Sequence, residues 1–175
     1  NSRTMRKLKN SELNRLTPEE FKAAEKIPLV VVLDNVRSLN NIGSVFRTSD
    51  AFLVDRIFLC GITATPPNKE IHKTALGATD SVAWSYAERA EDLVKRLRSE
   101  GFRILSVEQA ESSVPLNHFH PKPGQKYAVV FGNEVKGVQQ RVVDLSDECL
   151  EIPQFGTKHS LNISVSCGIV LWDLY

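Results

Sequence analysis

The chain has 175 residues, of which 42% are hydrophobic and 25% are charged, and its formal net charge is +1. These proportions are ordinary for a soluble globular protein and exclude a largely disordered chain. The length suits one α/β domain that buries roughly two-thirds of the surface of its unfolded chain. The charge is not the strongly basic balance typical of a protein that coats a phosphate backbone, so an RNA partner would need a local patch or two subunits together.

The cysteines and the apolar runs exclude several classes of protein. Cys60, Cys149 and Cys167 are far apart, and no C-x-x-C pair or Cys/His ligand spacing is present. We therefore expect no metal site and no disulfide framework, but reduced, buried thiols. No apolar run approaches the ~20 residues that span a bilayer, and no signal peptide precedes the domain. The sequence predicts a cytoplasmic protein without a membrane partner.

Residues 1–27 are predicted to form a helical extension before the main domain. Thr17 can cap a helix, Pro18 suits its first position and Glu20 completes a capping box. We expect this short helix to run to about Lys26. Positive charge gathers ahead of it, and a solvated terminal segment explains that charge somewhat better than an arm dedicated to RNA. The cations are Arg3, Arg6, Lys7 and Lys9.

Residues 28–175 are predicted to form one domain of the α/β class. The apolar run at 29–33 is rich in β-branched residues, which is typical of a strand buried on both faces of a parallel sheet. Strands and helices then alternate, and this order predicts an open, mainly parallel sheet with helices on both faces. Further strands are expected at 56–60, 102–107 and 126–131, and helices at 42–52, 88–100 and 160–175.

The first polar segment follows the strand at 29–33 and therefore lies at the carboxyl edge of the sheet, where open α/β proteins bind ligands. Asn41 and Arg47 are six residues apart, close to two helical turns. With Asn41 at or near the helix cap, Arg47 can point from the same helix towards the cleft, and its guanidinium suits phosphate. Taken alone, a capping Asn41 and a solvated Arg47 explain this segment better.

The second polar segment is the G-N-E-V-K-G turn at 132–137, directly after the predicted strand at 126–131. Its two glycines let a ligand approach the backbone closely. Glu134 at the tip could contact a substrate or fix the loop. The turn is neither a dinucleotide fingerprint nor a P-loop. A plain strand-to-helix turn, with Gly137 supplying a positive φ, is an equally good explanation.

The third polar segment covers residues 150–166, where a short strand ends at Pro153, a glycine loop follows and a helix opens near Ser160. Backbone groups in such a loop could bind the edge of an adenine and the polar end of a cofactor. Ser160 is most simply a helix N-cap. Asn162 is harder to explain as a structural residue, because asparagine is a weak helix former.

Together the three segments read N-x-G-x-x-x-R, G-N-E-x-x-G and I-P-x-x-G-x-x-x-S-L-N-x-S, in this order. Each pattern is weak by itself, but three in register resemble the motifs of the SpoU (TrmH) family of the SPOUT methyltransferases. The resemblance spans about residue 29 to the C-terminus. It implies an enzyme that uses S-adenosylmethionine to methylate a ribose 2′-hydroxyl of tRNA or rRNA. It also implies a C-terminal trefoil knot and a homodimer whose two subunits form the active site.

The resemblance also assigns roles residue by residue. By motif position it implies that five residues are catalytic, namely Asn41, Arg47, Glu134, Ser160 and Asn162. It implies that the cofactor contacts four further positions, largely through backbone groups and apolar packing around adenine, namely Gly132, Asn133, Ile152 and Leu161.

The implied reaction is the in-line transfer of a methyl group from a sulfonium to a ribose oxygen. The protein must then align the two groups and remove the hydroxyl proton. An arginine acting as the base is strained, because a guanidinium has a pKa above about 12. We therefore expect Arg47 to grip a phosphate or polarise the 2′-oxygen, while Ser160 or Asn162 orients the hydroxyl.

Other interpretations stay open beside this one. Asn41 and Arg47 disfavour a SPOUT enzyme that methylates a base nitrogen. Intact polar motif positions disfavour a module that binds cofactor or RNA without catalysis, and a nucleotide-dependent oxidoreductase lacks its glycine fingerprint. Residues 66–73 are expected to form an ordinary exposed loop, with an RNA-facing loop as the alternative. His159 is expected at the surface, although it could lie near the site.

Overall fold

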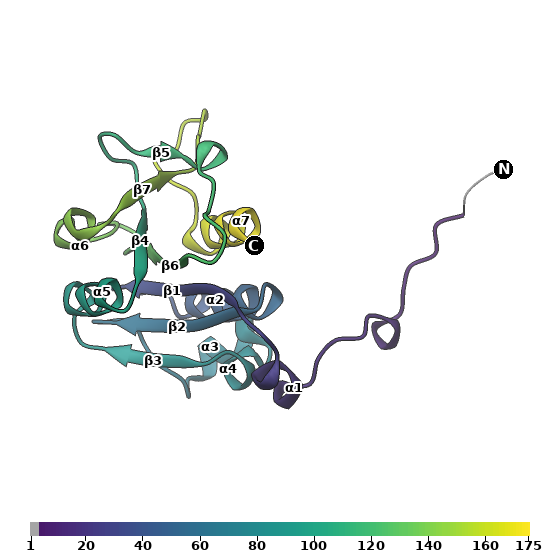
Figure 1. The fold of residues 1–175 in the computed structure, drawn as a ribbon. Coiled ribbons are helices and arrows are strands. Elements are labelled where there is room, and N and C mark those ends of the chain that lie inside the picture. Colours follow the sequence, from purple (N-terminus) through teal and green to yellow (C-terminus); the bar gives the residue numbers. More distant parts are fainter. Residues whose placement is uncertain (1–3) are drawn as a thin grey trace.

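The computed structural model describes residues 4–175, in which an extended N-terminal segment leads into a sheet flanked by helices (Figure 1). Residues 1–3, and with them Arg3 of the predicted basic segment, lie outside the described residues. The extended segment carries the short 3-10 helix η1 (Asn10–Glu12). Arg6 forms an ion pair with Glu12 at 3.0 Å, so this cation already has an acidic partner within the segment.

The first α-helix, α1 (Pro18–Ala23), begins as the sequence predicts. Thr17 Oγ1 accepts a hydrogen bond from the backbone N–H of Glu20 at 3.1 Å. The helix ends at Ala23 rather than near Lys26, because the backbone of the next residue is already extended. Phe21 is buried and joins the main hydrophobic core, so α1 packs on the domain even though it precedes the sheet.

A seven-stranded sheet forms the centre of the domain, with the strand order β3-β2-β1-β6-β4-β7-β5. Every pair of neighbouring strands is parallel, which confirms the predicted parallel α/β architecture. The prediction missed β3 and β5, which are short and only partly buried. The strands are β1 (Ile27–Asp34), β2 (Val54–Cys60), β3 (Trp84–Ala87), β4 (Phe102–Val107), β5 (Val114–Pro115), β6 (Lys126–Phe131) and β7 (Glu148–Glu151).

Helices cover both faces of the sheet, as predicted. Alternate residues of a strand point to opposite faces, so Val31 and Leu33 pack in one apolar cluster and Val30 and Val32 in another. The first cluster includes residues of α2 and α7, and the second includes residues of α5 and α6. The helices are α2 (Leu39–Ala51), α3 (Lys69–Ala75), α4 (Ala78–Ser81), α5 (Ala90–Ser99), α6 (Gln140–Leu145) and α7 (Ile163–Leu174), with the 3-10 helix η2 (Leu116–His118).

The expected exposed loop at 66–73 is wrong in its second half, where α3 begins at Lys69. Asn68 caps this helix, because its Oδ1 accepts hydrogen bonds from the N–H groups of Glu70 at 2.9 Å and Ile71 at 3.2 Å. Ile71 is fully buried in the core. The two consecutive prolines before Asn68 favour a loop, which is why the sequence pattern does not predict the helix. The capping asparagine and the buried isoleucine explain why a helix forms there.

The starts of two other helices also differ from the prediction. Ser38, not Asn41, caps α2, and its Oγ accepts the N–H of Asn41 at 3.2 Å. Asn162, not Ser160, caps α7, and its Oδ1 accepts the N–H of Ser164 at 2.8 Å. The weak helix former that the sequence leaves unexplained therefore occupies the position that asparagine prefers.

The thiols are free and mostly buried. Cys60 and Cys167 are buried and Cys149 is half-buried. Burial raises the pKa of Cys60 and of Cys167 to about 12, so both stay protonated at neutral pH. Within residues 4–175, no group of three His, Cys, Asp or Glu side chains is placed to hold a metal ion, and no helix is long and apolar enough to cross a membrane.

Candidate functional site

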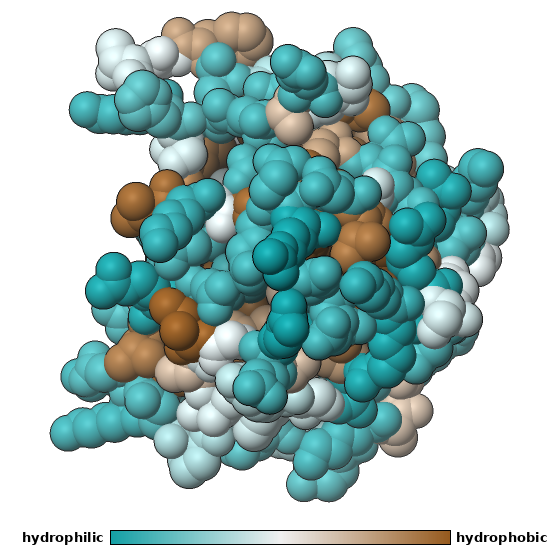
Figure 2. Space-filling model, turned by 90° about the vertical axis from the view of Figure 1, so that its left-hand side faces the viewer, coloured by the Kyte–Doolittle hydropathy of each residue, from teal (hydrophilic) through white to brown (hydrophobic). Residues whose placement is uncertain are grey.

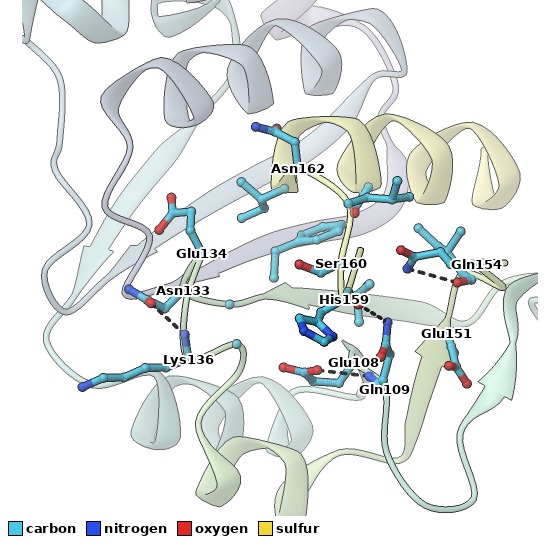
Figure 3. A pocket seen from close by; sticks show the side chains of 18 of the residues that line it. Glu108, Gln109, Asn133, Glu134, Lys136, Glu151, Gln154, His159, Ser160 and Asn162 are labelled. Carbon is cyan, nitrogen blue, oxygen red and sulfur yellow. Dashed lines mark hydrogen bonds between the residues drawn. The ribbon is translucent and has the colours of Figure 1, made fainter. Parts of the chain in front are cut away.

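The main cavity lies at the carboxyl edge of the sheet, beyond the ends of β4, β6 and β7 (Figure 3). Parallel strands end at the same edge, so segments far apart in sequence meet there. The cavity has a volume of about 500 Å³. It brings together seven of the nine predicted site residues, namely Gly132, Asn133, Glu134, Ile152, Ser160, Leu161 and Asn162.

The turn after β6 closes on itself through two backbone hydrogen bonds. The N–H of Asn133 donates to the carbonyl of Gly137 at 3.0 Å, and the N–H of Gly137 donates to the carbonyl of Asn133 at 2.8 Å. Gly137 has a φ of +71°, as the sequence predicts. A Cβ atom on Gly132 would overlap the backbone of Gly137 and Val138. Both glycines are therefore required by the shape of the turn.

Asn133 holds the turn through its side chain. Its Oδ1 accepts the N–H groups of Val135 at 2.9 Å and Lys136 at 3.0 Å, while its Nδ2 donates to the carbonyl of Asn35 at 2.8 Å. These bonds employ both ends of the amide. A contact between Asn133 and a cofactor would therefore come from its backbone, which also lines the cavity.

Glu134 connects the second polar segment to the first. Its carboxylate accepts the N–H of Arg37 and the N–H of Ser38, each at 3.0 Å. Partial burial acts to raise its pKa, but these bonds, its own backbone N–H and a hydrogen bond from Asn41 together lower the pKa below the usual value of 4.5. Of the two roles expected for Glu134, fixing the loop is the one that these contacts support.

Asn41 and Arg47 lie on α2, outside the residues that line the cavity. Asn41 is 9% exposed, and its side chain helps to hold the ionised carboxylate of Glu134. Gly43 lets α2 pack on α3, because a Cβ there would overlap the backbone carbonyl of Ile71. Arg47 is exposed, and its side chain makes no hydrogen bond or ion pair within residues 4–175. A single chain therefore does not bring Arg47 to the cavity.

The third polar segment forms the opposite wall. Residues 155–161 are all exposed and lead into α7. Ser160 and Leu161 line the cavity directly, whereas the amide of Asn162 is engaged in capping α7 through Ser164. The structure thus accounts for Asn162 as a structural residue that also borders the cavity.

Sequence reasoning missed several cavity residues that lie outside the three motifs. Glu108 and Gln109 follow β4, and the carboxylate of Glu151 ends β7. His159 was not missed in the same way: it is exposed, as expected, and it also lines the cavity, as the alternative for this residue allowed. The position of the missed residues in the sequence could have predicted them, because polar residues directly after parallel strands gather at the carboxyl edge. Together with Glu134 and Lys136, these residues give the cavity an acidic majority among its charged side chains.

A comparison with known families identifies the chain. Residues 28–172 match the model of the SpoU rRNA Methylase family. The chain belongs to this family. The match covers the whole sheet beyond its first residue and ends within α7, so all three polar segments of the SpoU domain fall inside it.

Curated relatives and solved structures agree with the assignment. Over 150 residues the SpoU chain is 31% identical to a tRNA (guanosine(18)-2′-O)-methyltransferase of Aquifex aeolicus, covering 83% of this chain and 67% of that one. It is 29% identical over 144 residues to the 23S rRNA (guanosine-2′-O-)-methyltransferase RlmB of Neisseria meningitidis, covering 82% and 56%. The structure of an AdoMet-bound rRNA methyltransferase from Sinorhizobium meliloti superposes with a TM-score of 0.79 at 26% identity, covering 91% and 60%. The chain therefore spans less than two-thirds of several relatives.

Proposed function

We propose that this protein transfers a methyl group from S-adenosylmethionine to a ribose 2′-hydroxyl of tRNA or rRNA. The observation that carries the proposal is the cavity at the carboxyl edge, which the second and third SpoU segments line together. We place the catalytic domain at residues 28–175, with 1–27 as an extension, and we expect the threaded C-terminus that the family resemblance implies. An RNA substrate makes the cytoplasm the expected location.

The residues of the cavity fit S-adenosylmethionine. Its volume of about 500 Å³ is within the range of sites for ligands of this size. Ile152 and Leu161 supply apolar surface for an adenine, and Gly132 lets the turn after β6 pack closely on Gly137 and Val138 at the edge of the cavity. The acidic side chains suit a ligand with positive charge on its sulfonium and amino groups. When bound, this cofactor supplies an already activated methyl group.

The residues of the chain then have to position the ribose and manage one proton. Ser160 lines the cavity with its hydroxyl and can orient the ribose 2′-hydroxyl by a hydrogen bond. Arg47 lies away from the cavity of its own chain, so its guanidinium would have to reach the ribose or an adjacent phosphate from a second copy. The proposed reaction therefore needs a homodimer in which each site uses residues of both chains.

An exposed apolar stripe supports a second copy of the chain. The residues on the outer side of α7 recur at helical spacing, and Trp172 is 69% exposed. The ring of Phe52, at the end of α2, lies 5.9 Å from the ring of Trp172 and 5.6 Å from the ring of Tyr175. The stripe therefore reaches the helix that carries Arg47. The other members are Val165 and Ile169.

We expect Trp172→Asp to convert the dimer to a monomer and to lower methyl transfer by at least about tenfold, because a charge in a desolvated interface costs several kcal/mol. Size-exclusion chromatography with light scattering measures the change. Ile62→Asp is the matched control, because Ile62 is 63% exposed but lies on the loop after β2. A wild-type protein that is monomeric at micromolar concentration would contradict the proposed dimer.

We expect Arg47→Lys to lower kcat by about tenfold or more at every pH, because lysine lacks the planar fork that binds phosphate or oxygen bidentately. The rate–pH profiles of the two proteins provide the measurement. Arg15→Lys, in the extended segment, is the control. Full activity of the lysine variant would rule out a specific role for the guanidinium.

One side of the molecule presents a mainly polar face (Figure 2). Figure 2 shows the side of the molecule that lies at the left of Figure 1, where hydrophilic side chains surround smaller apolar patches.

The proposed function is tested by calorimetry with S-adenosylmethionine, followed by radiolabelled methyl transfer to total RNA. Digestion of the product and mass spectrometry then locate the methyl group. A methyl on a base nitrogen would favour the other SPOUT chemistry, and binding without transfer would favour a module without catalysis.

A further inference from the structure

Two side chains at the end of β4 contact both walls of the cavity (Figure 3). Glu108 Oε1 accepts the N–H of Val138, directly after the G-N-E-V-K-G turn, at 2.8 Å. Its Oε2 accepts the N–H of Gln109 at 3.0 Å. Gln109 Nε2 then donates to the carbonyl of His159 on the opposite wall at 2.8 Å. A continuous path of hydrogen bonds therefore runs from one wall to the other.

The wall formed by residues 155–161 has little else to hold it. All seven residues are exposed. Among residues 4–175, the bond from Gln109 to His159 is the one hydrogen bond that ties this stretch to another element. A loop with few anchors samples many conformations, and a ligand that needs one of them binds more weakly. By restraining this loop, Gln109 is placed to reduce the affinity that any ligand of the cavity would lose to the motion of the loop.

The other wall is shaped around Glu108. A Cβ atom on Gly137 would collide with the carboxylate of Glu108, so the glycine leaves the space that the carboxylate fills. From this space Glu108 reaches Val138, next to the position where Gly132 packs on the backbone. The carboxylate is thus part of the packing of the turn, although Glu108 directly follows β4 and does not belong to the motif.

We propose that Glu108 and Gln109 act as a positioning pair, which joins the two loops of the cavity and thereby sets the affinity for S-adenosylmethionine. The inference rests on the proposed function. It concerns residues that hold other residues in place, since both side chains are engaged by protein groups. The pair should therefore change the binding of the methyl donor more than the rate of transfer at saturation.

The test compares Glu108→Gln and Gln109→Glu with Glu111→Gln in the full chain. Glutamine at 108 keeps one acceptor instead of two, and glutamate at 109 keeps the shape but cannot donate to the His159 carbonyl. Glu111 is exposed on the following loop and serves as the control. We expect each of the first two changes to weaken binding of S-adenosylmethionine by about tenfold in calorimetry, because a cavity loop that loses its anchoring hydrogen bond spends less time in the conformation that binds.

Kinetics and stability separate a positioning role from a general loss of structure. We expect the KM for S-adenosylmethionine to rise about tenfold. The kcat at saturating donor and the KM for RNA should stay within about twofold of wild type, and the Tm of the ligand-free protein should stay within a few degrees of wild type. A kcat that falls while the KM for the donor stays constant would overturn the inference. A variant that does not fold leaves Gln109→Glu, at an exposed position, to decide.

The two proposals fail in different ways. Wild-type protein that does not bind S-adenosylmethionine would overturn the proposed function and the positioning pair together. Wild-type protein that binds it, with Glu108→Gln and Gln109→Glu both binding equally well, would overturn the positioning pair alone. Amide exchange in the ligand-free protein adds an independent measurement, because the N–H of Val138 should exchange faster in Glu108→Gln than in the control.

Discussion

Gly132→Ala is expected to weaken the binding of S-adenosylmethionine strongly while the sheet stays folded. A methyl group at this position would overlap the backbone of Gly137 and Val138. Backbone cannot rotate away as a flexible side chain can, so the whole turn must move. Overpacking of this kind costs about 1–3 kcal/mol, and a turn that moves into the cavity removes the donor site as well. We expect the affinity to fall by at least about 30-fold.

Calorimetry with S-adenosylmethionine measures the effect, and circular dichroism reports whether the domain is folded. Gly156→Ala is the matched control, because Gly156 lies in the other loop and a Cβ there would meet no atom within 4 Å. Equal affinities for the two variants would show that the close approach at Gly132 is not needed for the site.

Glu134→Ala is expected to reduce kcat/KM for methyl transfer by about 10- to 100-fold. The change leaves the N–H groups of Arg37 and Ser38 without the carboxylate that accepts both at 3.0 Å. Bonds to a charged acceptor contribute about 1.5–3 kcal/mol each when well shielded, and the exposure of Glu134 reduces this contribution. The first and second polar segments should then separate, so that Asn41 moves away from the rim of the cavity.

Steady-state kinetics on a methylatable RNA provide the measurement. Glu88→Ala is the control, because Glu88 is also exposed but lies after β3. Glu134→Gln, which retains one acceptor, should lie between the alanine variant and wild type. Full activity of Glu134→Ala would contradict the role of this carboxylate in joining the segments.

The same carboxylate predicts a dependence of stability on pH. Hydrogen bonds outweigh the effect of burial and lower the pKa of Glu134 below 4.5 in the folded protein. The ionised carboxylate therefore stabilises the folded state, fully at pH values above 4.5, and this contribution is lost as the pH falls through the lowered pKa. Denaturation of wild type and Glu134→Gln in guanidinium should show a difference in unfolding free energy at neutral pH that shrinks in acid. A difference that is independent of pH would contradict the assignment.

The parts of the fold that follow from local patterns could be predicted from the sequence. The apolar run of β1, the N-cap of α1 at Thr17 and the positive φ of Gly137 depend on residues close together in the chain, and the structure shows each of them, although Glu20 does not return the second hydrogen bond of a full capping box. The three polar segments also follow strands, so their meeting at the carboxyl edge is a consequence of parallel strand order. The turn at Gly132 and the exposed loop at His159 lie where this argument places them.

Other features depend on the order of the strands, which no local pattern encodes. β6 lies between β1 and β4, and this brings Glu134 to the backbone of Arg37, 97 residues earlier, and Glu108 to Val138. The helix starts, by contrast, depend on single local hydrogen bonds, and Asn162 rather than Ser160 caps α7, which begins at Ile163. The distance of Arg47 from the cavity depends on how α2 packs. The sequence alone was sufficient to predict the main strands, the segments that carry polar residues and the local backbone of the glycine turn. Tertiary packing decided which distant polar groups meet, because those contacts form only once the sheet is assembled.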